Sequence, residues 1–531
     1  MSGPVLNGPF DIADMRAWVP RRLKPWLFIV FVLIIQFSGG VYLAAASDMV
    51  GSTALMNQDI LMAGYAQLAG MSLNFAVMFR IKFRFSNRTV LLGCCIVLLA
   101  ANYICSHTAS VLVLVATCFI AGWFRMQATF ACNSTIQLWI TPVRDMSIFF
   151  CYVYLIVDGV IQLLGVATIY TAVNGVWEDM HLLNAGLLVV MMILVMVFMR
   201  PVHAPLHIPL LGIDWLGAIL WSGFMLCFTY VCVYGNYYDW WQAREICAAT
   251  VIGLACLVIN LWRATFLRHP YISFMALKNR NVVRAVGIYI VFFTLMSTEH
   301  VVEHGYAASI LGFDEENMTS LNWYMFCGIL AGVIFSYLTF ARRRWRYKTM
   351  TAIGFSFAAL YLAYFYFLID FGVEKEALFL PIFCRGFGSV VISIVFLTSI
   401  VQSGLPFQIF PQALAINGFA CAVLGATLGP AVIGELLSHI TAKNISLLGS
   451  AFTHLESIGR IDELYGLVSV QAYAVSVKEI YGWLLMVCLV ALLAIMVSYF
   501  PTRPWAIFPK WRTIRRFLRR EGRAARKAAL R

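Results

Sequence analysis

The sequence predicts an all-α, polytopic membrane protein with fourteen transmembrane helices, grouped as six, two and six. Hydrophobic residues make up 62% of the 531 residues and charged residues only 12%, whereas charged residues are about 25% of an ordinary soluble domain. Apolar stretches of about 20 residues, the length needed to cross a bilayer, recur along almost the whole chain. Lysine and arginine gather in every second connection between these stretches.

Each apolar stretch is expected to form a helix, because lipid offers the backbone no hydrogen bonds. The expected spans are 25–46, 58–80, 89–107, 110–135, 147–172, 182–199, 215–235, 244–265, 284–306, 319–341, 348–370, 377–400, 411–438 and 479–500.

The distribution of basic residues predicts the orientation of the chain. When the N-terminus and every second connection are assigned to the cytoplasm, 31 of the 38 Lys and Arg residues lie on that side. Fourteen spans return the chain to its starting side. We therefore expect a multi-pass protein of the cell (inner) membrane with both termini in the cytoplasm.

Connection lengths predict how the spans are grouped. The long cytoplasmic connections 200–214 and 263–284 bracket the seventh and eighth spans, and 439–478 is the longest external connection, where a short helix is expected. The expected parts are a cytoplasmic segment 1–24, a six-helix bundle 25–200, two linking helices within 201–265, a six-helix bundle 266–500 and a basic cytoplasmic tail 501–531. The tail mixes basic with apolar residues, which suits either a helix on an anionic lipid surface or a solvated tail.

Several function classes are excluded by composition and motifs. The net charge of +13 is arranged by membrane side, so no nucleic-acid partner is expected. The 14 cysteines lie in apolar stretches, so we expect them to be core residues and neither to form disulfide bonds nor to bind a metal. No GxxxxGK[ST] phosphate loop occurs, so ATP hydrolysis is unsupported. We expect no enzyme activity, no metal and no cofactor.

Three ionisable residues are expected well away from the ends of their spans, where a charge costs about 2.5–3.5 kcal/mol and therefore suggests a function. Asp158 lies about 11 residues into the fifth span, near the bilayer midplane. Burial favours its neutral form, so it could carry a proton from one side to the other; the alternative is an acid with a permanent partner. Arg125 and Arg385 lie in the fourth helix of each half and could bind an anionic group, hold a carboxylate ionised, or donate to backbone carbonyls.

A second charged group lies near the outer end of the ninth span. Glu299 and Glu303, and likewise His300 and His304, are spaced i, i+4. Protonation of Glu299, His300 and Glu303 could gate a cavity that opens outward; the alternative is a solvated helix end. His300-Val-Val-Glu303-His304 also fits the His-x-x-Glu-His pattern of some zinc hydrolases, an alternative that lacks a third ligand.

Local motifs carry a resemblance across about residues 110–500. They are Gly212-Ile-Asp214-Trp215-Leu-Gly217, Gly235-Asn-Tyr-Tyr-Asp-Trp240-Trp241, His269-Pro270 with Leu277 to Asn281, Trp177 with Asn184, Arg385-Gly386-Phe-Gly388, and Ala415 to Gly418 followed by Gly425, Gly429, Pro430 and Gly434. Together they resemble the fourteen-helix drug:proton antiporters of the major facilitator superfamily. The resemblance implies two pseudo-symmetric bundles, alternating access, and export of a small hydrophobic or amphiphilic substrate against protons. It also implies a periplasmic adaptor and an outer-membrane channel as partners.

The chain departs from that family at several positions. The loop from Arg80 to Arg88 keeps basic residues, Arg84 and Arg88 among them, but lacks the acidic residue of the family's Gly-x-x-x-Asp-Arg-x-Gly motif. Gln36 lies where an acidic residue often occurs in the first helix, and the Gly-Pro pair of the fifth-helix motif is absent.

The remaining site predictions concern the cavity and the moving parts. Gln36, Gln127 and Gln162 are expected at the substrate cavity with Arg125 and Arg385. Conformational roles are expected for Arg84, Arg88, Gly425, Gly429 and Pro430, the last three because small residues and proline permit close approach and a bend. Substrate is expected between the helices at 25–46, 110–135, 284–306 and 377–400. A proton-coupled uptake symporter for a polar nutrient or peptide is the main alternative.

Overall fold

The computed structural model describes residues 14–141, 145–202, 212–267, 269–403, 405, 409–451 and 461–498. Within these ranges the chain is helical and contains no strand, only an isolated bridge between Met15 and Met199. The prediction of an all-α polytopic membrane protein is confirmed. The expected basic tail 501–531 lies outside the described residues.

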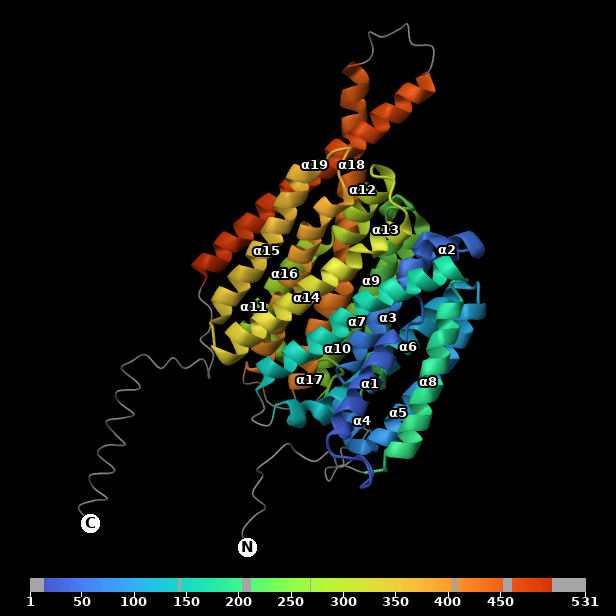
Figure 1. The fold of residues 1–531 in the computed structure, drawn as a ribbon, viewed down its shortest axis with the longest axis vertical. Helices are drawn as coiled ribbons and strands as arrows, with labels where there is room; N and C mark the ends of the chain where they lie inside the picture. The colour runs from blue at the N-terminus through green and yellow to red at the C-terminus, as the bar shows by residue number, and fades with distance from the viewer. Residues whose placement is uncertain are drawn as a thin grey trace, which may run out of the picture.

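Most helices of the N-terminal half coincide with the expected spans (Figure 1). They are α1 (Leu23–Phe37), the short α2 (Ala46–Ser52), α3 (Asn57–Asn74), α4 (Met78–Arg84), α5 (Asn87–His107), α6 (Val111–Ile140), α7 (Met146–Asn174) and α8 (Asp179–Phe198). The linking helices are α9 (Trp215–Tyr234) and α10 (Arg244–Phe266).

The helices of the C-terminal half are interrupted by π-helical turns. They are α11 (Arg280–Met296), the π-helical turn η5 (Glu299–Glu303), α12 (His304–Ser309), α13 (Glu315–Thr319), α14 (Leu321–Ser336), the π-helical η6 (Tyr337–Arg342), α15 (Tyr347–Leu368), α16 (Phe379–Val401), α17 (Phe410–Gly418), the π-helical η8 (Phe419–Leu428), α18 (Gly429–Ala451) and α19 (Ile461–Val497).

The number of spans is close to the expected fourteen. In the described ranges, 12 helices are long and apolar enough to cross a membrane, and α3 with α4 would make a thirteenth span that is bent by 62°. The remaining expected span contains the shorter apolar helix α1.

The first expected span, 25–46, is wrong at its end, because helix α1 stops at Phe37. Ser38, Gly39 and Gly40 follow in irregular conformation. A Cβ atom at Gly40 would lie 2.6 Å from Cys118 Sγ, so this stretch passes very close to α6. Glycine allows that approach, and the two adjacent glycines weaken the helix at the same place.

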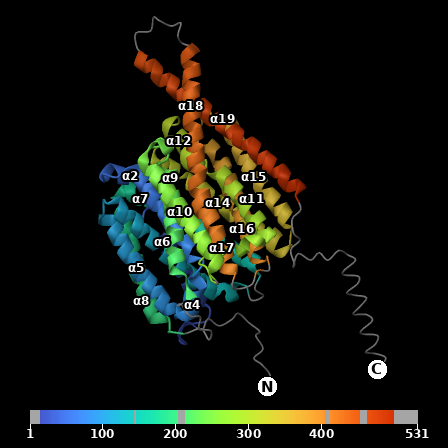
Figure 2. The same ribbon diagram turned by 180° about the vertical axis from the view of Figure 1, so that it is seen from behind.

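The external connection 439–478 is also corrected, because most of it is helical. Helix α18 runs on to Ala451 and α19 begins at Ile461, so the two helices extend well beyond the bundle (Figures 1 and 2). They are joined by hydrogen bonds from Asn444 Nδ2 to Ser476 Oγ, 2.9 Å, and from Lys443 Nζ to Glu479 Oε1, 3.1 Å. Hydropathy marks only the apolar part of such helices, which explains why only a short helix is expected from the sequence where two long polar extensions occur.

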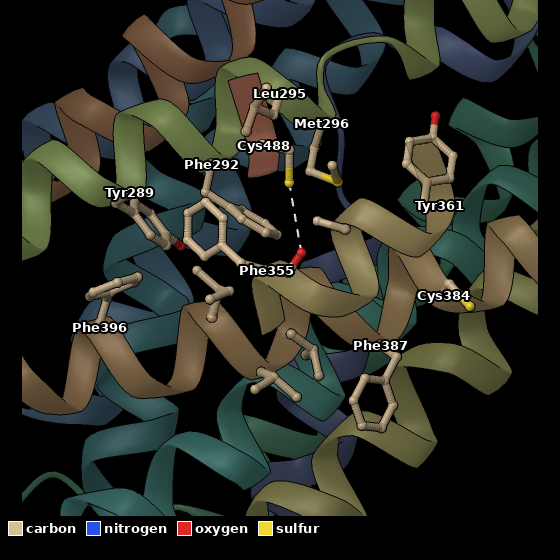
Figure 3. Close-up of a cluster of buried hydrophobic side chains, with 14 of the residues drawn as sticks. Tyr289, Phe292, Leu295, Met296, Phe355, Tyr361, Cys384, Phe387, Phe396 and Cys488 are labelled. Carbon is tan, nitrogen blue, oxygen red and sulfur yellow. Dashed lines mark hydrogen bonds between the residues drawn. The ribbon is translucent and has the colours of Figure 1, made fainter. Parts of the chain in front are cut away.

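The two halves lie side by side, with the N-terminal half in blue and cyan and the C-terminal half mainly in yellow to red (Figure 1). Helix α7 packs against α14 of the other half, and α3 packs against α17 and η8. The C-terminal core is an apolar cluster in which Phe292 and Phe355 meet edge to face with ring centroids 5.2 Å apart (Figure 3). We call the end that carries α4 and residues 342–348 the basic end, and the opposite end the far end.

Helices α3 and α6 approach so closely that glycine is required at their contact. A Cβ atom at Gly70 would lie 2.0 Å from the backbone oxygen of Phe119, and one at Gly122 would lie 2.0 Å from that of Gln67. Backbone oxygens cannot move aside as a flexible side chain can.

We expect Gly70→Ala to lower the thermal stability of the purified protein, because overpacking a well-packed contact costs about 1–3 kcal/mol. Gly93→Ala is the matched control, since Gly93 is also helical but has nothing within 4 Å of its Cβ position. Thermal unfolding in detergent measures both. Equal midpoints for the two variants would show that α3 and α6 are not in this contact.

Candidate functional site

A central cavity of about 1070 Å³ lies between the two halves of the bundle. Its lining comes almost equally from the N-terminal half, through α1, α3, α4, α6 and α7, and from the C-terminal half, through α11, η5, α14, α16, α17, η8 and α18. At the basic end the lining includes Phe83, Gln137 and Phe410, and toward the far end it reaches Gln162 and Glu299. The cavity therefore extends from the middle of the bundle to the basic end.

The wall of the cavity is mainly aromatic and sulfur-containing. Ten aromatic side chains and six methionines line it: Phe75, Phe79, Phe83, Phe130, Phe149, Phe150, Phe293, Phe410, Tyr154 and Tyr289, with Met71, Met78, Met126, Met146, Met296 and Met325. Aromatic rings offer large flat apolar surfaces, and methionine adapts to ligands of different shape. Such a wall suits a hydrophobic or amphiphilic ligand of the size that this volume admits.

Three charged side chains line this wall among the described residues: Asp158, Glu299 and Arg385. Asp158 lies on α7, about 18 Å along the helix from its start. No hydrogen bond or ion pair joins it to any other described residue, and its electrostatic neighbours are Tyr154 and Cys421. A carboxyl group without a fixed partner in an apolar wall is free to bind a proton or a ligand.

Glu299 and Arg385 belong to a buried charge cluster at the far end of the cavity. Arg385 Nη2 lies 3.0 Å from Glu299 Oε1, and Arg385 Nη1 lies 2.6 Å from Glu303 Oε2. Arg385 comes from α16 and the two glutamates from η5, so this cluster joins two helices of the C-terminal half. One arginine thus holds two carboxylates, of which Glu299 faces the cavity.

Tyr361 on α15 fixes this cluster from the side away from the cavity. Its hydroxyl donates to Glu303 Oε2, 2.9 Å, and lies 2.9 Å from Thr298 Oγ1. The Arg385 guanidinium lies 5.8 Å from the centre of the Tyr361 ring, within cation–π range. Figure 3 shows the Tyr361 hydroxyl pointing away from the neighbouring apolar cluster. Buried charges need this kind of hydrogen bonding to be stable.

Arg125 has different partners from Arg385, although the two occupy corresponding helices. Its Nη2 donates to the backbone oxygen of Gln36, 2.7 Å, and to Gln36 Oε1, 2.9 Å. Gln36 lies in the last turn of α1, where carbonyl groups lack helical partners. Arg125 therefore caps the interrupted helix α1. It also positions Gln36, which lines the cavity, while Arg125 itself does not.

The other expected site residues are distributed over several places. Gln162 lines the cavity, whereas Gln127 is buried outside the lining, with its Nε2 3.5 Å from the backbone oxygen of Met78. Arg84 is exposed and Arg88 half-buried at the basic end. The side chain of His300 lies outside the described part of the structure.

Gly425, Gly429 and Pro430, for which a conformational role is expected, lie at the end of a π-helical segment that packs closely on α11. The π-helical η8 ends at Leu428, immediately before Gly429 and Pro430. Ser297 Oγ donates to the backbone oxygen of Gly425, 3.1 Å, and a Cβ atom at Gly429 would lie 2.1 Å from Ser297 Oγ. Glycine is needed at this contact, and the π-helical turn lets the helix accommodate proline.

Reading the sequence missed the polar residues that surround the charges. Tyr361 and Thr298 were not singled out, nor was the group formed by Tyr154, Tyr289 and Ser393 in the cavity, where Tyr289 donates to Ser393 Oγ at 3.1 Å. A tyrosine facing a buried charge and one facing lipid look alike in a sequence. Polar residues within apolar spans were the available signal.

No protein-family model matches the chain, and no curated protein matches its sequence. Solved structures do match it. A peptide transporter named POT is 14% identical with a TM-score of 0.57, and the match covers 92% of this chain and 98% of that chain. The nucleoside transporter NupG is 12% identical with a TM-score of 0.52, covering 90% and 100%. The human organic anion transporter MFSD10 is 10% identical with a TM-score of 0.51, covering 89% and 100%.

These likenesses extend over nearly the whole chain and concern its fold. The chain therefore shares the helical fold of these structures, and its two halves lie around a central cavity.

We expect Arg385→Met to lower thermal stability strongly, because removing one partner of a buried ion pair costs about 3–5 kcal/mol. It would leave the Glu303 carboxylate beside Glu299 without a positive charge. The double variant Arg385→Met with Glu303→Gln should recover part of the loss. Thermal unfolding of the purified protein measures all of these effects.

The matched control for this experiment is Lys443→Met. It removes the exposed ion pair with Glu479, whose contribution is expected to be below about 1 kcal/mol. An Arg385→Met variant as stable as this control would contradict the described cluster.

Proposed function

We propose that the protein is a secondary active transporter that exports a hydrophobic or amphiphilic compound from the cytoplasm in exchange for protons. The observation that carries this proposal is the cavity between the two halves, whose aromatic and methionine wall contains Asp158, a carboxyl group with no hydrogen bond or ion pair to another described residue. The fold it shares with known transporters and the resemblance to drug:proton antiporters support it. In this proposal the basic end faces the cytoplasm, as the positive-inside rule predicts.

The proposed cycle uses Asp158 as the group for which proton and substrate compete. In an apolar wall a carboxylate gains stability by binding a proton or by pairing with a donor or cationic group of the substrate. Substrate that enters from the basic end displaces the proton, and a proton taken up from the other side displaces the substrate. Export and proton entry are then linked at one side chain.

The cluster of Arg385, Glu299 and Glu303 serves in this cycle as a sensor at the far end of the cavity. Glu299 is bound by Arg385 and faces the cavity. Its protonation would weaken its attraction to Arg385 and loosen η5 from α16. Opening at the far end would thereby depend on a proton.

Uptake by proton symport is a second candidate. Matching structures described as a peptide transporter, a nucleoside transporter and a proton-dependent oligopeptide transporter support a proton-coupled carrier of a polar substrate. Polar groups in the same cavity, among them Gln36, Gln162 and the Tyr289–Ser393 pair, could bind a polar substrate.

A zinc hydrolase receives little support. Glu303, the central residue of its motif, is held by Arg385 and Tyr361. Among the described residues no group of three His, Cys, Asp or Glu side chains could hold a metal.

Asp158→Asn should reduce proton-driven efflux in sealed vesicles at least about tenfold, because the amide cannot exchange a proton at working pH. Binding of a neutral hydrophobic substrate should persist, since the aromatic wall is unchanged. Asp158→Glu is the matched control and should retain a substantial part of the efflux. Unchanged efflux in Asp158→Asn would remove Asp158 from the coupling mechanism.

The sign of the proton movement distinguishes the two transport modes. In proteoliposomes loaded with substrate and an internal pH dye, outward flow of substrate should acidify the lumen under antiport, because protons move inward. Symport would carry protons out with the substrate and make the lumen more alkaline. A substrate-dependent alkaline shift would therefore replace the export proposal with the symport alternative.

A further inference from the structure

We propose that the turn between the two linking helices is a latch that holds the two bundles together at the far end. This turn comprises residues 235–243, and we call it the linker turn. The inference goes beyond the proposed function, because it assigns a conformational role to the additional helix pair. It depends on that proposal only in that the far end must open during alternating access.

The linker turn is anchored first to the N-terminal half. The hydroxyl of Tyr234, the last residue of α9, donates a short hydrogen bond to Asp59 Oδ1 near the start of α3. Asp59 is itself fixed, because its Oδ2 accepts from the backbone nitrogen of Met56 at 2.9 Å. Tyr234 also packs with Met62 of α3 and Ile246 of α10 in a small apolar cluster. The attachment therefore combines apolar packing with a buried hydrogen bond.

The same helix pair is attached to α3 again at its basic end. The hydroxyl of Tyr271, which follows α10, donates to the backbone oxygen of Leu73 at 2.9 Å, near the end of α3. Helices α3 and α9 also pack directly along their length. Two attachments at opposite ends of α3 tie the linking pair to the N-terminal half, while α9 also packs against η8 of the C-terminal half through Trp221 and Phe224 on Phe419.

Toward the C-terminal half, the linker turn makes a charge-assisted hydrogen bond. The indole Nε1 of Trp240 donates to Glu435 Oε2 of α18 at 2.7 Å. The other carboxylate oxygen of Glu435 lies 2.8 Å from His439 Nε2, so this carboxylate is held from both sides. Figure 2 shows α9, α10 and α18 side by side on one face of the molecule, which agrees with this contact.

The backbone of the linker turn is shaped to present Trp240. Asp239 and Trp240 both adopt the left-handed conformation, with φ of 51° and 55°, which non-glycine residues rarely occupy. The Trp240 ring lies over Gly235, where a Cβ atom would come within 2.7 Å of it. The Trp240 backbone nitrogen also donates to the Gly235 oxygen at 2.7 Å. Such a strained conformation persists only where surrounding contacts hold it.

These contacts place the latch across the seam between α3 and α18. The lining of the cavity extends to the basic end, whereas at the far end the linking pair joins the two halves through Tyr234 and Trp240. Opening the far end would draw α18 away from α3. Because the linker turn is anchored to α3, the hydrogen bond between Trp240 and Glu435 must then break.

Trp240→Phe tests the latch, because it removes the indole donor and keeps an aromatic ring over Gly235. Hydrogen bonds to charged groups are strong enough that the far end should open about tenfold more often. Hydrogen–deuterium exchange of the full-length protein in lipid nanodiscs should show about tenfold faster exchange in peptides covering 57–63 and 430–440. Peptides from α14 to α16 should be unchanged.

Trp241→Phe is the matched control. Trp241 is the neighbouring tryptophan of the same turn and is 62% exposed, and its side chain makes no hydrogen bond to another described residue. It should exchange like the unchanged protein. Glu435→Gln keeps an acceptor without its charge and should lie between the control and Trp240→Phe.

Two outcomes would overturn the latch. One is unchanged exchange at 57–63 and 430–440 in Trp240→Phe; the other is faster exchange spread evenly over the whole chain, which would indicate a general loss of stability. The measurement needs neither substrate nor a proton gradient. A failed latch and a failed transport proposal are therefore distinguishable, because normal exchange with intact transport contradicts only the latch.

Discussion

A charge buried in a membrane protein needs a partner, and the cluster of Arg385, Glu299 and Glu303 meets this need with two carboxylates on one guanidinium. Other features of the C-terminal half depend on this arrangement. The π-helical turn η5 carries both glutamates, and Tyr361 of α15 provides a further hydrogen bond to Glu303. Three helical elements are therefore fixed relative to one another at the far end of the cavity.

Much of the fold could be predicted from hydropathy, because the thickness of the bilayer sets the length of an apolar helix. The expected spans 215–235 and 244–265 correspond to Trp215–Tyr234 and Arg244–Phe266. The interruptions could not be predicted in the same way. Helix α1 ends at Phe37 because Gly40 lies against Cys118 and because Arg125 caps the carbonyl group of Gln36. Both Cys118 and Arg125 belong to another helix, α6. Hydropathy contains no information about such contacts.

The site was predictable in its charged residues but not in their pairing. Asp158 and Arg385 could be singled out because ionisable residues are rare in apolar spans, and the structure places both at the cavity. The sequence also makes Arg125 and Arg385 look equivalent, since they occupy corresponding helices. Their partners differ because α1 presents a backbone carbonyl and Gln36 to Arg125, whereas η5 presents two carboxylates to Arg385.

The contrast between the two carboxylates bound by Arg385 and the carboxyl group of Asp158, which has no partner among the described residues, indicates how the two ends of the cavity can have different roles. Glu299 and Glu303 are bound by Arg385 at the far end, so a ligand that approaches them must compete with a strong internal partner. Asp158 has no hydrogen bond or ion pair within the described residues and lies among aromatic side chains, where a ligand can bind it without breaking a salt bridge. A substrate should therefore reach Asp158 first, and the far-end cluster should respond only to a change in protonation. This order suits a transporter, because it keeps the far end closed while the substrate binds.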